Sequence, residues 1–515
     1  MEHLTYSFSN VIMKYNRNIF YTQKEIIMKK IIVFLLAMTM VFSVLTLASC
    51  AEKKTETDKG GNDNVDDGRI WLDNLPDDID LQGETVTFVG HGQPTAERFG
   101  LEGTFVDEPN GDTVADAMHE STENVKNRFN VEIDCITASD MLTKSITSQL
   151  MAGDSDYDVL VGYAYYDISL ASSGYVLDVN SLGDLGAGDI IDTNQPYWAK
   201  NYIESASYKG KSFWLVGDIS IETLGCMYVT FVNDALYQKT CNETFGNIYD
   251  VVNNNEWTID KLSEMSALCY SDLNGNDKAD DPDVYGWATH WIHAVDGITI
   301  GLGIEYTERL ADGTIALTIS SNPRNIDLLQ KLYNFKSLAT SHTYSEEIAT
   351  INAFKEDRVM FMVNTLRHAE INLRDMETDY YILPVPKLDT AQENYRTGIH
   401  DQCAIFGISY ASEKVYASAV VLEALCAEHS RLVRPKYYDE ALKYKYTRDD
   451  ASADMIDIVR DSVFTDFALC WAKDLGGITH TIRNLAPNPQ STLKKGLPTW
   501  TKSLETLTQN FENAQ

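Results

Sequence analysis

The sequence lacks the motifs that identify several large classes of protein. It has no Lys/Arg-rich run, and its 42 basic residues are outnumbered by 76 acidic ones, so the formal net charge is -34. An acidic surface repels a phosphate backbone, which argues against nucleic acid as the partner. There is no G-x-S-x-G nucleophile elbow, no P-loop and no H-E-x-x-H motif. The usual signatures of a serine hydrolase, a nucleotide-binding ATPase and a zinc protease are therefore missing.

Cysteine is scarce and scattered. The chain has 8 cysteines without a single C-x-x-C pair, and those after Cys50 are spread along the whole sequence. The seven cysteines after Cys50 are an odd, unclustered set, which argues against a disulfide framework and against a structural zinc site. Most of these cysteines have apolar neighbours, as Cys426 does, so we expect them to pack as small hydrophobic side chains.

The first fifty residues have the pattern of a targeting segment. Met28-Lys29-Lys30 is followed by an uncharged run from Ile31 to Leu47 and by small residues before Cys50. This order predicts a secretory signal peptide over residues 28–49, and we interpret residues 1–27 as translation from an upstream Met. The segment ending at Cys50 resembles the lipobox of bacterial lipoproteins, in which this cysteine is acylated and becomes the new N-terminus. An uncleaved anchor helix is the alternative.

Removal of the leader would change the length and the net charge of the protein. The mature protein would run from Cys50 to Gln515, or 466 of the 515 residues. Residues 1–49 hold five basic and two acidic side chains, so the mature charge would be -37. Residues 50–80 contain few apolar side chains, and we expect them to form a flexible tether. The location predicted for the protein is the extracellular face of the cell membrane, attached by lipid only.

Strand and helix patterns alternate along the rest of the chain. A β-branched strand at 85–89 is followed by a helical pattern at 114–129, which begins behind Asp112, and further strands are expected at 131–135 and 157–162. A second set of expected strands lies at 227–232, 359–363, 380–384 and 404–409. No internal repeat is present. This order predicts an α/β fold with two lobes, in which ligands bind beyond the carboxyl ends of the strands.

Several short motifs in the predicted order resemble one family of binding proteins. They lie at Asp156–Val159, Gly174–Asn180, Gly217–Ser220, Trp257–Leu262, Tyr381–Lys387, Tyr437–Asp439 and Arg448–Asp450. Together they resemble family 1 extracellular solute-binding proteins, the lipid-anchored binding components of ABC importers, over about residues 81–510. The resemblance implies a periplasmic-binding-protein-like fold of type II with hinge strands between the lobes. Lobe 1 would comprise 81–225 with about 404–445, and lobe 2 would comprise 226–403 with about 446–515.

The segment from Asp272 to Asp283 matches a calcium-binding loop. Oxygen-bearing side chains at positions 1, 3, 5, 9 and 12, with a backbone carbonyl at 7, suit Ca²⁺, and the loop resembles those of EF-hands and dockerins. It departs from them at Asp277, where glycine is usual, and at Asp283, where EF-hands have Glu. A polar loop of Asx turns is the alternative. We expect a structural Ca²⁺ held by Asp272, Asn274, Asn276, Lys278, Asp280 and Asp283.

Aromatic and polar side chains near the expected strand ends suit a sugar site. Sugars stack their apolar faces on aromatic rings and form hydrogen bonds to charged and amide side chains. Each candidate could equally be a core or surface residue. His290 and His293 are spaced three apart, but no third ligand supports zinc there. The predicted ligand-binding residues are Tyr163, Tyr166, Trp198, Trp214, Glu222, Trp287, His290, Trp291, Arg367, Asp401 and Trp471.

The resemblance implies a receptor that captures a carbohydrate of oligosaccharide size and delivers it to the permease subunits of an importer. We expect a monomer. We also expect no enzymatic activity, because the many acidic residues make accidental carboxylate pairs common and no glycosidase pair can be identified. Two alternatives stay open at this point. One is a surface enzyme that acts on polysaccharide, and the other is a ligand-sensing lipoprotein that signals to a histidine kinase.

Overall fold

A computed structural model describes residues 71–91, 100–153, 156–290, 293–443, 450–484 and 486–514. The chain divides into two compact units, Met1–Asp67 and Gly68–Gln515, and all described residues belong to the second. The predicted leader (1–27 and 28–49), the lipidation site at Cys50 and most of the predicted tether lie outside the described residues. Within the described part, no helix is both long enough and apolar enough to cross a bilayer.

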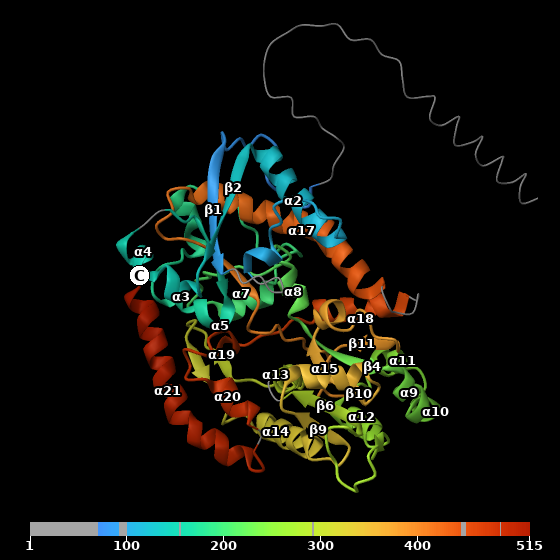
Figure 1. Ribbon diagram of the computed structural model, residues 1–515. Helices are drawn as coiled ribbons and strands as arrows, with labels where there is room; N and C mark the ends of the chain where they lie inside the picture. The colour runs from blue at the N-terminus through green and yellow to red at the C-terminus, as the bar shows by residue number, and fades with distance from the viewer. Residues whose placement is uncertain are drawn as a thin grey trace, which may run out of the picture. The chain divides into compact units, whose positions relative to one another are not determined.

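The first lobe is built on a four-stranded sheet with the order β12-β3-β1-β2. β1 pairs in parallel with both β2 and β3, whereas β12 comes from much later in the chain and pairs antiparallel with β3. The edge strand of this lobe is thus supplied after the chain has returned from the second lobe (Figure 1). The strands are β1 (Glu84–His91), β2 (Val131–Ala138), β3 (Val159–Tyr163) and β12 (Ala404–Ile408).

Alternation along the strands buries both faces of this sheet. In β3, Val159 and Val161 belong to one buried cluster and Leu160 to another, as the two-residue period of a strand requires. The helices α2 (Thr113–Phe129) and α17 (Val415–Lys443) pack against each other. α2 begins where predicted, because the Asp112 carboxylate accepts hydrogen bonds from the backbone N–H groups of Val114 and Ala115 (3.1 and 2.9 Å).

The second lobe is built on a larger mixed sheet with the order β11-β4-β10-β6-β5, to which β9 adds beside β6. The central strand β10 is buried at all seven positions and pairs parallel with β6 and antiparallel with β4. The strands are β4 (Tyr228–Asn233), β5 (Tyr270–Ser271), β6 (Val284–His290), β9 (Ser341–Tyr344), β10 (Val359–Thr365) and β11 (Tyr380–Leu383). A separate hairpin joins β7 (Thr307–Arg309) and β8 (Ile315–Leu317).

Helices surround both sheets. In the first lobe they are η1 (Gly100–Gly103), α3 (Leu142–Ser145), α4 (Thr147–Ala152), α5 (Ala164–Asp167), α6 (Ser169–Ser172), η2 (Val179–Leu185), α7 (Lys200–Ala206) and α8 (Ile221–Gly225). In the second they are α9 (Asp234–Thr240), α10 (Asn242–Phe245), α11 (Ile248–Asn253), α12 (Ile259–Ser266), α13 (His293–Gly301), α14 (Pro323–Lys336), α15 (Glu347–Lys355) and α16 (His368–Ile371).

Two chain segments cross side by side between the sheets. Met227 and Ile399 form an antiparallel bridge, which is extended by hydrogen bonds from Tyr228 N to the Gly398 carbonyl (3.0 Å) and from His400 N to the Cys226 carbonyl (2.8 Å). Gly398 has no room for a side chain, because a Cβ there would lie 2.5 Å from Ile300 Cδ1. The two-lobed α/β fold predicted from the sequence is therefore confirmed, with paired crossing segments at its centre.

The folded region begins earlier than the sequence suggested. Asp73 and Arg128 form a buried ion pair (2.7 Å), with side chains that are 1% and 7% exposed. The Arg128 guanidinium also lies 4.4 Å above the Trp71 ring. Residues 71–80 therefore pack against α2, and the predicted tether over 50–80 is wrong for this part. The charged segment that predicts a tether includes Asp73, whose carboxylate pairs with Arg128 of α2.

The last described helices contact both lobes. They are α18 (Asp450–Asp461), α19 (Phe467–Cys470), α20 (Ile478–Arg483) and α21 (Pro489–Asn513). α18 packs beside β11, and α19 packs beside α7. α21 contacts α14 in the second lobe and α6 in the first, and it runs as a long red helix along the side of the molecule (Figure 1). The sequence predicts that residues 446–515 belong to the second lobe alone, whereas α21 also contacts the first lobe.

One aromatic side chain fixes the end of α21 to the first lobe. Phe511 is 1% exposed and stacks on Tyr208 with ring centroids 4.8 Å apart. It also meets Trp471 edge-on at 5.0 Å. An ion pair between Lys209 and Glu512 (2.7 Å) lies beside this aromatic contact at the surface. The contact therefore combines a buried ring cluster with a solvent-screened charge pair.

We expect Phe511→Ala to lower the free energy of unfolding by about 3 kcal/mol, because the substitution leaves a cavity among the rings of Tyr208, Phe213 and Trp471. Urea denaturation followed by tryptophan fluorescence measures this change. Glu505→Ala, on the exposed side of the same helix, should change the stability by less than about 0.5 kcal/mol. Equal effects of the two substitutions would show that the end of α21 is not anchored.

Candidate functional site

Three tyrosines gather where β3 ends. The strand finishes at Tyr163 and the chain turns at once into α5, so Tyr165 and Tyr166 follow the carboxyl end of a central strand. The ring of Tyr166 lies 5.4 Å from that of Tyr163 and 5.0 Å from that of Tyr165. All three side chains are partly exposed. This is the edge of an open α/β sheet at which ligands usually bind.

The crossing segment brings an acidic side chain to the same place. Tyr165 N donates a hydrogen bond to the Asp401 carbonyl (2.9 Å), and Ala164 N donates one to the Cys403 carbonyl (3.1 Å). The Asp401 carboxylate, 28% exposed, lies 3.5 Å from Arg483 Nη2. Arg483 belongs to α20, so the crossing segment links the strand end in the first lobe to the C-terminal helices.

Arg483 connects this region to the second lobe. Its Nε lies 2.9 and 3.0 Å from the two carboxylate oxygens of Asp296, and its Nη2 lies 2.6 Å from one of them. Asp296 is in α13 and the Arg483 side chain is only 7% exposed. Burial raises the pKa of Asp296 and of Asp401, and the hydrogen bonds and charge of Arg483 oppose that rise. One buried guanidinium thus serves two carboxylates from different elements.

Other charged groups from the C-terminal segment approach the tyrosines. The Lys473 ammonium lies 4.7 Å above the Tyr166 ring, and the Tyr165 hydroxyl lies 3.4 Å from His480 Nε2. Asp474 is partly buried, and burial raises the pKa of its carboxyl. Its Oδ2 has no hydrogen-bond partner among the residues that the structure describes.

A second acid and arginine lie behind the tyrosines. Arg367 Nη2 donates to Gln402 Oε1 (2.8 Å), and Gln402 in turn interacts with the Tyr163 hydroxyl. Glu222 lies near Arg367 and is 4% exposed. One of its carboxyl oxygens accepts from Gly100 N, whereas the other has no hydrogen-bond partner in the described part of the chain. Burial raises the pKa of Glu222 well above its ordinary value.

We name this continuous set the junction cluster. It joins the end of β3, the crossing segment, α8, α13, α20 and the turn after β10, so both lobes contribute to it. Of the predicted site residues, the structure brings Tyr163, Tyr166, Glu222, Arg367 and Asp401 together here. The members are Tyr163, Tyr165, Tyr166, Glu222, Asp296, Arg367, Asp401, Gln402, Lys473, Asp474, His480 and Arg483.

The predicted ligand-binding residue His290 is not a member of the junction cluster. His290 ends β6, and its nearest acidic neighbours are Glu347 and Glu346 at the start of α15. Burial lowers the pKa of His290. Glu347 also lies 3.2 Å from His368. Trp291 lies outside the described residues.

Four predicted tryptophans are core residues rather than ligand-stacking ones. Trp198, Trp214, Trp287 and Trp471 are at most 4% exposed. The indole N–H of Trp214 donates to the Ile168 carbonyl (3.1 Å), and that of Trp471 donates to the Ala206 carbonyl (3.0 Å). Trp287 packs against Phe335, with ring centroids 4.8 Å apart. Their rings are covered on all sides by protein, which corrects the sequence-based assignment to a ligand surface.

The prediction from sequence missed the C-terminal half of the cluster. Asp296, Gln402, Lys473, Asp474, His480 and Arg483 carry no motif. The only available signal was the spacing of His480 and Arg483, which are three residues apart and therefore share a helix face. Nothing in the sequence indicated which strand end that face would meet.

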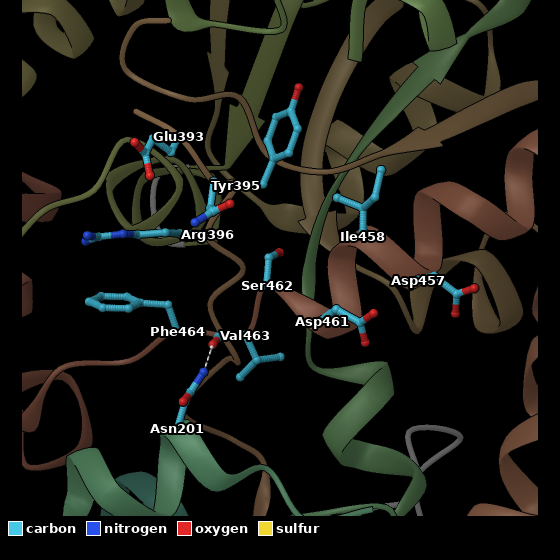
Figure 2. A pocket seen from close by; sticks show the side chains of 11 residues that line it. Asn201, Glu393, Tyr395, Arg396, Asp457, Ile458, Asp461, Ser462, Val463 and Phe464 are labelled. Atoms are coloured by element: carbon cyan, nitrogen blue, oxygen red, sulfur yellow. Dashed lines mark hydrogen bonds between the residues drawn. The ribbon is translucent and has the colours of Figure 1, made fainter. Parts of the chain in front are cut away.

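A pocket of about 600 Å³ lies elsewhere between the two lobes (Figure 2). Several of its polar side chains contact other residues, whereas Arg396 Nη1 is buried without a hydrogen-bond partner among the described residues. Asn201 donates to the Val463 carbonyl (3.1 Å), and Arg396 lies 4.2 Å above the Phe464 ring. None of the predicted site residues lines it. The lining residues are Asn201, Glu393, Asn394, Tyr395, Arg396, Asp457, Ile458, Asp461, Ser462, Val463 and Phe464.

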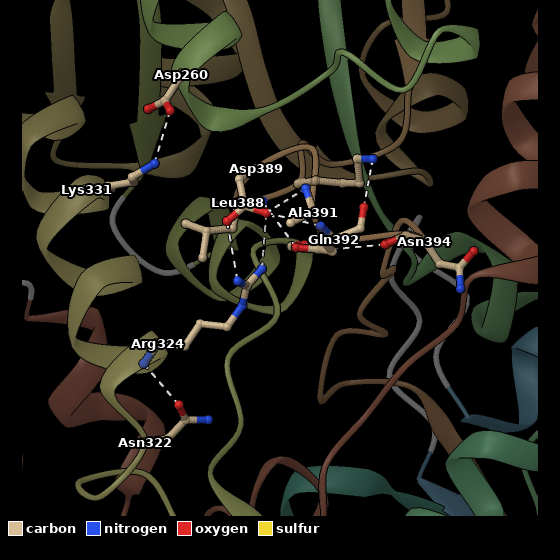
Figure 3. Close-up of polar contacts among 11 residues, drawn as sticks. Asp260, Asn322, Arg324, Lys331, Leu388, Asp389, Ala391, Gln392 and Asn394 are labelled. Atoms are coloured by element: carbon tan, nitrogen blue, oxygen red, sulfur yellow. Dashed lines mark hydrogen bonds and ion pairs between the residues drawn. The ribbon is translucent and has the colours of Figure 1, made fainter.

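The wall of this pocket is held by a polar network on the second lobe (Figure 3). Gln392 donates to the Gly301 and Asn394 carbonyls (2.8 and 3.0 Å) and accepts from Leu388 N (3.1 Å). Asp389 pairs with Arg324 at 3.3 Å. These contacts fix the segment that follows β11, so we assign the pocket wall a structural role and place the candidate site at the junction cluster.

The predicted calcium loop satisfies its own polar groups. The Asp272 carboxylate accepts from Gly275 N and Asp277 N (2.6 and 2.8 Å), and Asp277 adopts the left-handed backbone that the match to calcium loops requires (φ 57°). The amide nitrogens of Asn274 and Asn276 donate to the two Asp280 oxygens (2.9 and 2.6 Å).

Hydrogen bonds join Asp280 to three other predicted ligands, Asn274, Asn276 and Asp283. Asp283 is fully buried and accepts from Leu273 N, Asp280 N and the Tyr270 hydroxyl. Over the described ranges, no group of three or more His, Cys, Asp or Glu side chains is placed to hold a metal ion. Calcium stays a prediction of the sequence, and the polar loop of Asx turns stays its alternative.

Comparison with known proteins identifies the fold. No family model and no curated protein sequence matches the chain. Among solved structures, a cyclo/maltodextrin-binding protein complexed with maltotetraose matches with a TM-score of 0.55 and 11% identity, over 82% of this chain and 97% of that one. The galacto-N-biose/lacto-N-biose I-binding protein of an ABC transporter from Bifidobacterium longum, in complex with lacto-N-biose, matches with a TM-score of 0.52 and 12% identity, over 83% and 99%. This chain shares their two-lobed fold.

The calcium hypothesis can be tested by metal removal. We expect Asp283→Ala to lower the free energy of unfolding by about 2 kcal/mol in the presence of EDTA, because three donors lose a buried acceptor. Lys278→Ala, at an exposed position of the same loop, is the matched control. A rise in the Tm of the unsubstituted protein on adding CaCl₂, lost in Asp272→Asn, would establish a cation. An unchanged Tm would contradict the calcium prediction.

The carboxyl group of Glu423, which binds the buried Trp198, should make the stability of the protein depend on pH. Glu423 accepts from the Tyr197 hydroxyl (2.5 Å), from Trp198 Nε1 (2.9 Å) and from Asp192 N (3.2 Å). Burial raises the pKa of Glu423 to about 7, above its ordinary value of 4.5. The unfolded chain therefore loses this proton at a lower pH than the folded protein does, so the contribution of Glu423 to stability falls as the pH rises from about 4.5 to about 7.

Relative to Glu423→Gln, the unsubstituted protein should lose on the order of 3 kcal/mol of stability across this range and nothing further above it. Urea denaturation of both proteins at several pH values measures the difference. A difference that stays constant with pH would show that Glu423 is ionised in the folded protein.

Proposed function

We propose that this protein is the extracellular solute-binding component of an ABC importer, that its ligand is a carbohydrate of oligosaccharide size, and that the junction cluster binds it. The observation that carries the proposal is the composition of the cluster. Three partly exposed tyrosines lie beside acids, arginines and an amide contributed by both lobes. Sugar rings stack on aromatic faces while their hydroxyls exchange hydrogen bonds with such side chains.

The fold supports the same proposal. The matched structures of this fold include proteins that bind maltotetraose and lacto-N-biose, the second from an ABC transporter. A ligand held between two lobes would favour one relative orientation of them through its differential affinity. A permease that recognises that orientation would then receive only loaded protein. Fold likeness alone does not fix a ligand, so the side chains of the cluster carry the argument.

The remaining elements of the proposal come from the sequence. We propose export through the signal peptide at 28–49, attachment to the membrane by an acylated Cys50, and action as a monomer without catalysis. The energy for uptake would come from a separate ATPase subunit, since this chain has no phosphate-binding loop. The protein would therefore act by binding and release alone.

Isothermal titration of the mature protein with a panel of oligosaccharides tests the function. We expect at least one member to bind, and Tyr166→Ala to weaken that binding about tenfold, which corresponds to about 1.4 kcal/mol. Tyr166 is partly exposed, so its loss should leave the Tm nearly unchanged. Tyr416→Ala removes another exposed tyrosine, 39% exposed in α17, and should not alter the affinity.

Failure of the whole panel to bind, together with binding of peptides or phosphorylated solutes, would overturn the proposal. Cleavage of the oligosaccharides by the purified protein would instead favour a surface enzyme. Binding with equal affinity to the unsubstituted protein and Tyr166→Ala would place the sugar site elsewhere in the molecule.

A further inference from the structure

Acidic side chains dominate the groups that face the junction cluster. Asp296, Asp401, Asp474 and Glu222 reach it from α13, the crossing segment, the turn before α20 and α8. Its two buried guanidinium groups both have acidic neighbours, Asp296 and Asp401 for Arg483 and Glu222 for Arg367. The lysine of the cluster, Lys473, is exposed and lies over the Tyr166 ring.

Two of the three guanidinium nitrogens of Arg483 already contact carboxylates. Its Nε and Nη2 together make three contacts of 2.6 to 3.0 Å with the Asp296 carboxylate, and Nη2 also faces Asp401 at 3.5 Å. A ligand carboxylate would have to displace one of these acids or lie beside them. Like charges at such distances in a poorly solvated site repel each other strongly.

Two carboxyl oxygens in the cluster need hydrogen-bond donors. Glu222 Oε2 and Asp474 Oδ2 are buried atoms without hydrogen-bond partners among the described residues. The Glu222 side chain is 96% removed from solvent, being 4% exposed. A hydroxyl group can donate to such an oxygen, whereas carboxylate, sulfate and ionised phosphate groups bring only acceptors. Leaving a buried acceptor unpaired costs free energy, so ligand hydroxyls would gain by reaching it.

We propose that the junction cluster selects neutral oligosaccharides and discriminates against counterparts that carry uronate, sulfate or phosphate groups. This inference rests on the proposed function and names the substrate class of the same site. The discrimination comes from the acidic side chains around Arg483, which both neutralise the guanidinium and repel an incoming anion. The hydroxyls of a neutral sugar instead find acceptors already in place.

Titration with matched pairs of ligands tests the inference. Each neutral oligosaccharide that binds is compared with an oligosaccharide of the same length that carries uronic acids, and with its sulfated derivative, at one pH and ionic strength. We expect the charged member to bind at least tenfold more weakly. Equal or tighter binding of the charged member would overturn the inference while leaving the proposed function intact. Absence of binding by all members would instead overturn the proposed function.

Substitution of one acid identifies the source of the discrimination. In Asp401→Asn, the amide keeps the shape of the side chain and removes the exposed negative charge, so the ratio of neutral to charged affinity should fall at least threefold. Asp474→Asn should act in the same direction and serves as a second variant if the first does not fold. The control is Asp389→Asn, whose acid pairs with Arg324 outside the cluster (Figure 3) and should leave the ratio unchanged.

Retention of the full ratio in both cluster variants would show that these carboxylates do not set it and would overturn the inference. An equal fall in the ratio for Asp389→Asn would do the same, because the effect would then reflect the net charge of the protein rather than the cluster.

Discussion

The pairing of the two crossing segments is the constraint on which the architecture depends. Met227 faces Ile399, and the backbone hydrogen bonds on either side are made by Tyr228 with Gly398 and by His400 with Cys226. These contacts fix where the chain leaves each sheet and where it returns. Because the return places Asp401 beside the end of β3, the backbone that joins the lobes also positions the candidate site. A Cβ at position 398 would lie 2.5 Å from Ile300 Cδ1, so a larger residue there would require the Ile300 side chain to shift.

Charge in the junction cluster is arranged around a small number of buried cations. Burying Arg483 would be costly without a partner, and its contacts with Asp296 and Asp401 offset that cost. Glu222 Oε2 and Asp474 Oδ2, in the same cluster, have no hydrogen-bond partners among the described residues. Such atoms also occur elsewhere in the described residues, including Arg396 Nη1 beside the pocket near Phe464. What distinguishes the cluster is their position beside three partly exposed tyrosines at the end of β3.

The sequence predicted the fold better than it predicted the site. Alternation identified β1, and the cap at Asp112 placed the start of α2 correctly, because both signals are local. The choice among tryptophans failed for a physical reason, since a ring that packs in a core and a ring that stacks on a sugar look alike in sequence. Asp73 was read as part of a tether because its buried partner, Arg128, is far away in the chain. His480 and Arg483 were missed for the same reason, as their neighbours are set by tertiary packing.

The strand β12 comes far later in the chain than its partner β3, and this separation affects folding. The first sheet is incomplete until Ala404–Ile408 pairs with β3, and the entire second lobe lies between these strands in the chain. A long loop must close before this pairing forms, and such non-local contacts slow folding. During synthesis the exposed edge of β3 would be open to pairing with other chains, a recognised route to aggregation. The first lobe therefore depends on a strand that only the full chain supplies.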